Sequence, residues 1–228
     1  MPHTLAVLIL AGGQSSRMGR DKASLEIDGI PLIRRIYDVV AACRDLTGQQ
    51  LAATAQIYVV TPWPQRYESM LPATCHFLPD LAPNCGPLVA FSNSLPAIAA
   101  TWILLLACDL PNLSTAIVQT WIDRLPTIPA ESVAYLVRQP DKGWEPLCGF
   151  YRQICSHSLR DYIDDSHSVV PPARLRQRGQ SFQGWLQLQP VTELVIADPY
   201  CLVNCNTPAD LATIVAARSH PTAPPSSP

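Results

Sequence analysis

Short apolar runs alternate along this chain with longer segments in which apolar residues recur at helical spacing. The first run occupies residues 4–10 and ends at two glycines. Runs of this length, bounded by glycine, proline or polar residues, are typical of strands that are covered on both faces. The strands predicted in this way span residues 4–10, 57–61, 75–78, 102–106, 132–137 and 147–151.

Helices are predicted between these strands, where apolar side chains recur every three or four residues. Pro31 suits the first turn of one helix, and Ser114 suits the N-cap of another. Pro96 is expected to end or kink the helix that contains it. The predicted helices span residues 31–43, 88–99, 114–125, 154–163 and 208–218.

The alternation of strands and helices indicates an α/β fold. We expect a Rossmann-like, open, twisted, mostly parallel sheet with helices on both faces, in a single domain over residues 1–218. Residues 166–190 mix prolines and basic residues with a short helix at 182–186, and we expect a surface excursion near the functional site. The segment SHPTAPPSSP at 219–228 is expected to be a disordered, proline-rich tail.

Composition excludes several classes of protein. Apolar residues make up 48% of the 228 residues, enough for a sizeable core, and the net charge of −2 argues against general binding to nucleic acid or an anionic membrane. No apolar run approaches the ~18 residues of a membrane span. The eight cysteines include no CxxC pair, which favours small buried thiols over a disulfide framework or a zinc site. We therefore expect a soluble, cytoplasmic protein.

A basic, glycine-rich loop follows the first strand, in the stretch ILAGGQSSRMGRDK at 9–22. Ligands gather at the carboxyl ends of strands in open α/β sheets. Gly12 and Gly13 let backbone N–H groups face phosphate oxygens, and Arg17 and Lys22 can neutralise a polyphosphate. A purely structural loop would need the glycines but not the cations.

Two familiar phosphate-binding motifs are absent from this loop. The Walker pattern needs Lys directly after its last glycine, whereas Gly19 is separated from Lys22 by two residues. The dinucleotide fingerprint GxGxxG is also missing. The loop therefore excludes a P-loop ATPase and an ordinary dehydrogenase.

The longer stretch LILAGGQSSRMGRDKASLEIDGIPLIRR strongly resembles the N-terminal signature of nucleotidyltransferases. Within them it is most similar to the molybdenum cofactor guanylyltransferase family, with its pattern LAGGxSxRMGxDKxxLxxxGxPL. Three further segments resemble that family in order and spacing: PDLAPNCGPL at 79–88, ACDLP at 107–111 and VNCNTPADL at 203–211. The resemblance implies a nucleotide-diphospho-sugar transferase-like fold, with an N-terminal part that binds nucleotide and a C-terminal part that binds the acceptor.

The reaction implied by this resemblance is transfer of GMP from GTP to the terminal phosphate of molybdenum-bound molybdopterin, with release of pyrophosphate. The implied cofactor is Mg²⁺, and the implied partners are GTP, the molybdopterin cofactor, and molybdoenzymes or their chaperones. A phosphate acceptor is already anionic near pH 7 and needs no dedicated base. This agrees with the five histidines, which all lie outside the motifs.

The resemblance also implies roles for individual residues. Lys22 and Arg17 would stabilise phosphate charge, and Asp109, directly after an apolar strand, would hold the metal with its hard oxygen ligands. The implied nucleotide contacts are Leu10, Ala11, Gly12, Gly13, Lys22, Thr61, Asp80, Gly86 and Asp109. The implied acceptor contacts are Glu145, Asn204 and Asn206.

Simpler structural roles remain open for several of these residues. Lys22 could be a solvated surface lysine, and Asp109 an N-cap or a partner in a loop salt bridge. Asn204 and Asn206 could be turn residues that cap the helix starting near Pro208, and Thr207 is another candidate for this cap. The chain also departs from the family pattern at Thr61, where several relatives carry Asn, and in the GPL segment, where Ala90 replaces a second glycine; neither change removes a charge or a metal ligand.

Two other functions are alternatives. A cytidylyltransferase acting on the same pterin is the nearest, although such relatives tend to read AAG where this chain has Ala11-Gly12-Gly13. A catalytically silent nucleotide-binding protein of the same fold is the other. Retention of both Lys22 and Asp109 speaks against it.

Overall fold

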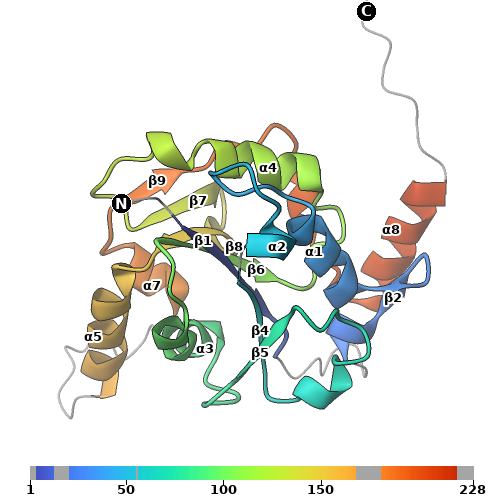
Figure 1. Cartoon of the computed structure of the whole chain (residues 1–228), viewed down its shortest axis with the longest axis horizontal. Helices are drawn as coiled ribbons and strands as arrows, with labels where there is room; N and C mark the ends of the chain where they lie inside the picture. The colour runs from blue at the N-terminus through green and yellow to red at the C-terminus, as the bar shows by residue number, and fades with distance from the viewer. Residues whose placement is uncertain (1–3, 13–20, 55, 168–180, 220–228) are drawn as a thin grey trace, which may run out of the picture.

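A seven-stranded sheet in the order β5-β4-β1-β6-β8-β7-β9 forms the centre of the molecule (Figure 1). The structure is a computed structural model, and it describes residues 4–12, 21–54, 56–167 and 181–219. A two-stranded ribbon, β2 (Glu26–Ile27) and β3 (Ile30–Pro31), lies outside this sheet. The strands of the sheet are β1 (Leu5–Leu10), β4 (Ile57–Thr61), β5 (His76–Pro79), β6 (Trp102–Ala107), β7 (Ala134–Gln139), β8 (Gly143–Arg152) and β9 (Val191–Glu193).

The direction of the strands confirms the mostly parallel sheet, with one exception. β1 pairs in parallel with β4 on one side and β6 on the other, and β5 extends the parallel array beyond β4. β8 runs antiparallel to both β6 and β7. Because buried residues look alike in parallel and antiparallel strands, the apolar pattern could not reveal this reversal.

Helices cover both faces of the sheet, as predicted (Figure 1). Ser114 caps α4 by accepting a hydrogen bond from the Ile117 N–H, and Pro96 lies in the 3₁₀ turn that ends α3, so both sequence-based expectations are confirmed. The helices are α1 (Leu32–Ala41), α2 (Leu51–Thr54), α3 (Pro87–Ser94), α4 (Thr115–Asp123), α5 (Cys155–His167), α7 (Phe182–Leu186) and α8 (Pro208–Ser219). The 3₁₀ turns are η1 (Lys22–Ser24), η2 (Pro64–Arg66), η3 (Leu95–Ala97), η4 (Leu125–Thr127) and η5 (Pro199–Leu202).

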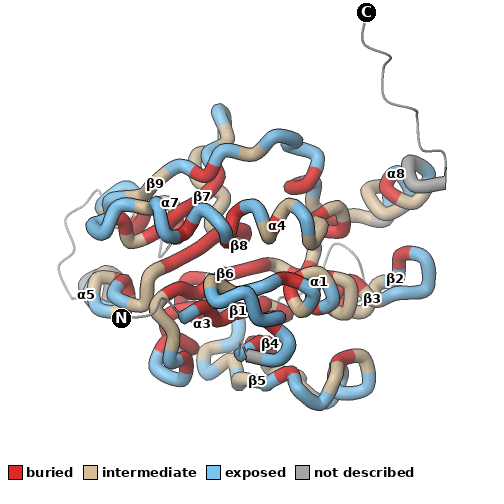
Figure 2. The backbone as a smooth tube through the Cα atoms, turned by 45° about the horizontal axis from the view of Figure 1, so that its top comes forward, coloured by how far each residue is buried: buried red, intermediate tan, exposed pale blue. Residues whose placement is uncertain are grey.

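The alternation of side chains along β1 divides the core into two layers. Val7 and Ile9 pack in the layer with α1 and α4, whereas Ala6 and Leu8 pack in the layer with α3, α5 and α7. Figure 2 shows that the buried residues follow the strands between these two helical layers. Burial on both faces explains why the strand sequence is continuously apolar.

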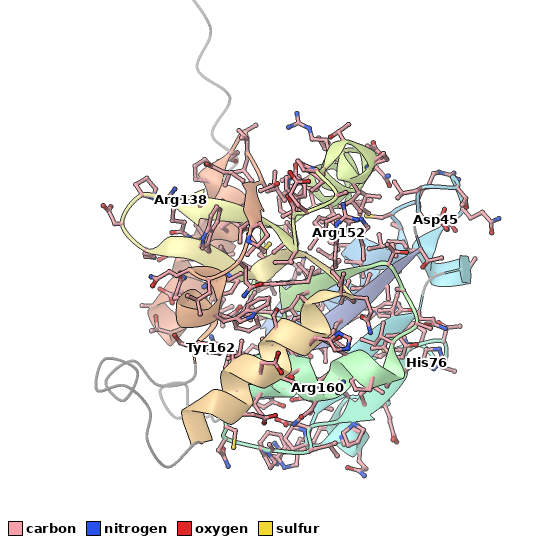
Figure 3. All side chains as sticks on the ribbon, turned by 90° about the vertical axis from the view of Figure 1, so that its left-hand side faces the viewer. Asp45, His76, Arg138, Arg152, Arg160 and Tyr162 are labelled. Atoms are coloured by element: carbon pink, nitrogen blue, oxygen red, sulfur yellow. The ribbon has the colours of Figure 1, made fainter. Side chains whose placement is uncertain are left out.

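The end of the segment 166–190 is part of the core, so the expectation of a surface excursion was wrong for it. The short helix predicted at 182–186 is present, but Phe182 and Trp185 are buried, and their rings pack against Tyr151. Tyr162 of α5 lies next to α7 (Figure 3), and a side chain at Gly184 would collide with its hydroxyl group. Residues 168–180 lie outside the described part of the chain, as do residues 220–228 of the expected tail.

The cysteines are free thiols, and seven of the eight are buried, as predicted. Cys85 is exposed in the loop before α3, where the expectation of burial was wrong. Burial raises the pKa of the Cys43 thiol to about 12. Among the residues that the structure describes, no helix has the length and apolar character needed to cross a membrane.

Candidate active site

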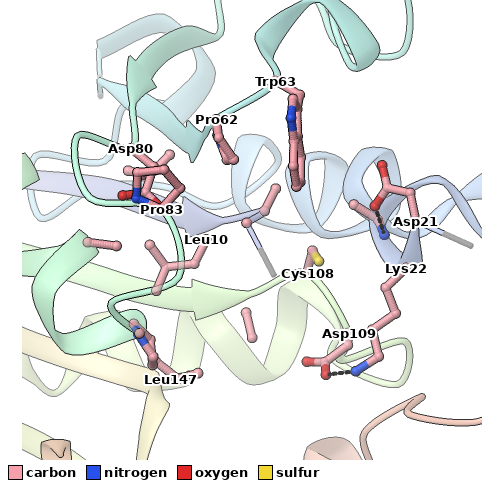
Figure 4. Close-up of a pocket in the computed structure, with 18 of the residues that line it drawn as sticks. Leu10, Asp21, Lys22, Pro62, Trp63, Asp80, Pro83, Cys108, Asp109 and Leu147 are labelled. Carbon is pink, nitrogen blue, oxygen red and sulfur yellow. Dashed lines mark hydrogen bonds and ion pairs between the residues drawn. The ribbon is translucent and has the colours of Figure 1, made fainter. Parts of the chain in front are cut away.

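A cavity of about 730 Å³ opens at the carboxyl ends of the parallel strands β1, β4 and β6 (Figure 4). Leu10 and Ala11 reach it from the end of β1, and Asp109 reaches it from the end of β6. Lys22 and Asp109 lie on one side, and Asp80 lies on the other. This edge is where open α/β sheets bind their ligands.

Gly12 lies at the cavity wall in a position where the structure leaves little room for a side chain. A Cβ atom at this residue would lie 3.1 Å from Pro62 Cδ and 3.6 Å from Asp80 Oδ2. The absence of a side chain therefore lets the backbone approach both the loop after β4 and the cavity. Gly13 and Arg17, which the sequence assigned to the same loop, lie outside the described residues.

Lys22 and Asp109 form an ion pair inside this cavity. The ammonium Nζ donates to Asp109 Oδ2 at 2.8 Å and also to the amide oxygen of Asn206. The two charged side chains are only 21% and 14% exposed, so Lys22 is not a solvated surface lysine. The salt bridge that the sequence left open for Asp109 is present, and it lies within the cavity.

The second carboxylate oxygen of Asp109 has the character of a cation ligand. Oδ1 is buried and has no hydrogen-bond partner within the described residues. Buried carboxylate oxygens are normally satisfied, and a hard oxygen of this kind suits Mg²⁺. The described residues contain no group of three or more His, Cys, Asp or Glu side chains that could hold a metal ion. A metal here would therefore take most of its ligands from phosphates and water.

Asp21 fixes the backbone turn that presents Lys22, a role that the sequence analysis missed. Its Oδ1 accepts a hydrogen bond from the Ala23 N–H at 3.1 Å, and its Oδ2 accepts one from the Tyr67 hydroxyl at 2.7 Å. Burial and this hydrogen bond raise the pKa of Tyr67. Aspartate is a favoured N-cap residue, so its position directly before Lys22 was the available sequence signal.

Trp63 also lines the cavity, although no sequence pattern pointed to it. Its indole ring extends from the loop after β4 (Figure 4), and the Arg66 guanidinium lies 4.2 Å from the ring centroid. Thr61 is fully buried and is not among the residues that line this cavity. Its Oγ1 instead accepts a hydrogen bond from the Trp63 N–H at 3.1 Å. In this structure Thr61 orients the neighbouring loop.

Asp80 and Gly86 both line the cavity, and Asp80 lies on the side opposite Lys22 (Figure 4). Asp80 Oδ1 accepts a hydrogen bond from the Ala82 N–H at 3.1 Å, which orders the loop after β5. Gly86 has φ 90°, a conformation that favours glycine, directly before the first turn of α3. Both of these residues from the PDLAPNCGPL segment therefore reach the cavity.

The three residues assigned to the acceptor do not all reach the cavity. Asn206 lines it, whereas Glu145 and Asn204 are not among its lining residues. Glu145 lies on β8, where its Oε2 accepts a hydrogen bond from Gln139 Nε2 at 2.8 Å. Burial raises the pKa of Glu145, and the charge of Asp109 adds to this effect.

Comparisons with known proteins agree with this geometry. Residues 7–179 match the family model of the MobA-like NTP transferase domain. The chain is 42% identical over 212 residues to the probable molybdenum cofactor guanylyltransferase of Trichormus variabilis, covering 93% of this chain and 91% of that protein. It is 40% identical over 207 residues to the protein of the same name from Synechococcus elongatus, covering 90% and 95%.

A solved structure supports the fold at lower sequence identity. The crystal structure of molybdopterin-guanine dinucleotide biosynthesis protein A from Archaeoglobus fulgidus superposes with a TM-score of 0.68 at 17% identity, over 94% of this chain and 98% of that one. Fold, cavity and relatives together define a nucleotidyltransferase. The chain belongs to the MobA-like NTP transferase domain family.

Proposed function

We propose that this protein transfers GMP from GTP to the terminal phosphate of molybdenum-bound molybdopterin and releases pyrophosphate. Relatives that are 40% and 42% identical over most of the chain carry the name probable molybdenum cofactor guanylyltransferase. The observation that carries the proposal is the half-buried ion pair between Lys22 and Asp109, at the edge of the sheet where phosphates would bind.

The nucleotide occupies the cavity between the side that carries Lys22 and Asp109 and the side that carries Asp80. Backbone groups of residues 10–12 approach it from the end of β1, and Asp80, on the opposite side from Lys22, contacts the base together with Gly86. Lys22 contacts the phosphates, where its ammonium charge stabilises the negative charge that develops on the leaving pyrophosphate. Arg17 supplies a second positive charge from the same loop.

Mg²⁺ fits the unpartnered Oδ1 of Asp109, with phosphate and water oxygens as its other ligands. When bound, the ion neutralises phosphate charge and orients the triphosphate. Asp109 also holds Lys22 through its other oxygen, so the two cationic centres are fixed relative to one carboxylate.

The acceptor phosphate attacks the α-phosphorus of GTP. One oxygen of the molybdopterin phosphate forms the new P–O bond while the bond between the α-phosphorus and the bridging oxygen breaks, and pyrophosphate leaves with the electron pair. A phosphate monoester has a second pKa of about 6, so near pH 7 it is mostly a dianion with no proton to remove. Catalysis therefore depends on positioning and charge stabilisation, with Asn206 beside Lys22 on the acceptor side.

The wider setting follows from this activity. Residues 1–218 act as a single domain in the cytoplasm, with nucleotide contacts in the N-terminal part and acceptor contacts in the C-terminal part, where Glu145 and Asn204 contact the acceptor outside the cavity that Asn206 lines. The product passes to molybdoenzymes or to their chaperones.

Pyrophosphate release measured with GTP, in the presence and absence of molybdopterin, tests this proposal. We expect release that requires both GTP and the pterin acceptor, together with a guanine dinucleotide product detected by mass spectrometry. A folded protein that binds GTP but releases no pyrophosphate with the acceptor would contradict the proposal and favour a silent nucleotide-binding protein.

A further inference from the structure

We propose that Asp210 is a positioning residue for the catalytic lysine: it holds the backbone of Asn206 so that the Asn206 side chain fixes Lys22 beside Asp109. This inference rests on the proposed nucleotidyl transfer, because it assigns Lys22 to the reacting phosphates. Asp210 itself is not among the residues that line the cavity, so its effect on the reaction passes through Asn206.

Asp210 forms a reciprocal cap at the start of α8. Its Oδ2 accepts hydrogen bonds from the backbone N–H groups of Asn206 and Thr207, both at 2.8 Å. The Thr207 hydroxyl oxygen accepts a hydrogen bond from the Asp210 N–H at 3.1 Å. The hydrogen bond from Asn206 is the largest of several influences that hold the pKa of Asp210 below its ordinary value. A capping box needs only the pair Thr207 and Asp210. Here Asp210 also accepts a hydrogen bond from Asn206, so the cap extends one residue further back, to the residue that contacts Lys22.

The segment that ends in this cap contacts both members of the catalytic ion pair. The Asn206 side-chain oxygen accepts a hydrogen bond from Lys22 Nζ, which also donates to Asp109 Oδ2 at 2.8 Å. The backbone N–H of Cys205 donates to the Asp109 carbonyl oxygen at 2.9 Å. A shift of the backbone at 205–206 would therefore move the partners of Lys22 and Asp109 together.

The helix that carries Asp210 is anchored to the segment that follows Lys22. Ile214 of α8 and Cys205 are buried with Ile27 and Leu32, and α8 lies beside the ribbon of β2 and β3 (Figure 1). This packing fixes α8, and the cap transmits its position to Asn206. Of the capping candidates in the sequence, Thr207 caps the helix through its hydroxyl oxygen, whereas the helix residue Asp210 orders the backbone of Asn206.

The opposing explanation is that Asp210 only stabilises α8. Both explanations predict a lower melting temperature for Asp210→Ala, so stability alone does not separate them. Ser114→Ala is a matched control, because Ser114 caps α4 through the Ile117 N–H and is not among the residues that line the cavity. Asp210→Asn retains an oxygen that can accept both backbone hydrogen bonds. It therefore tests whether a conservative substitution restores the kcat that Asp210→Ala loses.

The experiment compares kcat, KM for GTP and melting temperature for these three variants and the unmodified protein. We expect Asp210→Ala to lower kcat by about 10- to 100-fold, the scale of a misplaced catalytic group, with a smaller change in KM. We expect Asp210→Asn to recover most of this loss and Ser114→Ala to keep kcat within about twofold. A folded Asp210→Ala variant with kcat within about twofold of the unmodified protein would overturn the inference.

A double substitution tests the route through Asn206. In an Asn206→Ala background, Asp210→Ala should still lower the melting temperature but should reduce kcat by no more than about twofold. The Asn206 side chain through which Asp210 acts is already absent there, and the effects of substitutions at coupled residues do not add. Independent, multiplicative losses would show that Asp210 does not act through Asn206.

A measurement without turnover separates this inference from the proposed function. The NMR signal of the Lys22 side chain, assigned with Lys22→Arg, should shift in Asp210→Ala and stay unchanged in Ser114→Ala. If the unmodified protein transfers no GMP, the proposed function fails and this signal still decides whether Asp210 positions Lys22. An unchanged Lys22 signal in Asp210→Ala would overturn the positioning role.

Discussion

Lys22 Nζ lies 2.8 Å from Asp109 Oδ2, although the two residues are 87 positions apart in the sequence. The pair joins the segment that follows β1 to the end of the neighbouring parallel strand β6, where both side chains face one cavity. Only one oxygen of Asp109 is used in this contact, and the other is buried without a partner in the described structure. The arrangement brings an ammonium group and a carboxylate oxygen to one cavity, where they would face a polyphosphate and its cation.

Replacement of Gly12 by Val should weaken GTP binding by at least about tenfold, or ~1.4 kcal/mol. A side chain at this position would press on Pro62 and extend into the space beside Asp80. Calorimetric titration with GTP measures the change, and circular dichroism checks the fold. An unchanged affinity in a folded variant would show that the loop after β1 does not hold the nucleotide.

Asp109→Asn should reduce kcat by about 100-fold or more, the effect of losing a major electrostatic contributor. The substitution weakens the cation ligand and the contact with Lys22, while binding of GTP without Mg²⁺ should change less. Asp38→Asn is the matched control, because Asp38 forms an exposed i,i+4 ion pair with Arg34 and does not line the cavity. Near-normal Mg²⁺-dependent turnover in Asp109→Asn would refute the assignment of the metal ligand.

Trp63→Ala should raise KM for GTP by roughly 5- to 30-fold, because stacking of a base on an aromatic ring contributes about 1–2 kcal/mol. The ring lines the cavity, and the Arg66 guanidinium lies over one of its faces, 4.2 Å from the ring centroid. Trp63→Phe keeps an aromatic surface and should retain most of the affinity. Steady-state kinetics and quenching of tryptophan fluorescence on GTP addition measure the effect. Equal KM values for the Ala and Phe variants would contradict contact with the substrate.

Trp185→Ala should destabilise the protein by about 3–5 kcal/mol, the usual cost of removing a large core side chain. Trp185 is fully buried in α7, within the layer that contains Tyr151. Leu188→Ala, two residues beyond this helix, removes a side chain that is 69% exposed and should change stability by less than about 0.5 kcal/mol. Urea unfolding compares the two variants. Similar stabilities would mean that α7 does not belong to the core.

Much of the sheet was predictable from the sequence, because strands buried on both faces leave continuous apolar runs. The meeting of Lys22 with Asp109 was also predictable in outline, since β1 and β6 are parallel and their carboxyl ends share one edge. The sequence could not give the direction of β8, because antiparallel pairing does not change which residues are buried. It also placed α7 on the surface, because neighbouring prolines and basic residues obscured the buried face formed by Phe182 and Trp185.

Contacts that depend on the direction of a side chain were harder to predict from the sequence. Thr61 does not line the cavity and instead accepts a hydrogen bond from the Trp63 N–H, an outcome that a motif position cannot reveal. The role of Asp210 depends on hydrogen bonds that reach back across the start of α8 to Asn206. Such relationships require three-dimensional coordinates, because the residues involved have common structural roles as caps and turns.

The choice of nucleotide tests the central claim most directly. Competition kinetics with GTP, CTP and ATP, using molybdopterin as the acceptor, measure the ratio of kcat/KM values for the three nucleotides. We expect GTP to be preferred, because a site that hydrogen-bonds one base leaves buried polar groups unpaired with another, which can reduce kcat/KM by roughly 10⁴-fold. A higher kcat/KM for CTP with the unmodified protein would contradict guanylyl transfer and assign the enzyme to cytidylyl transfer.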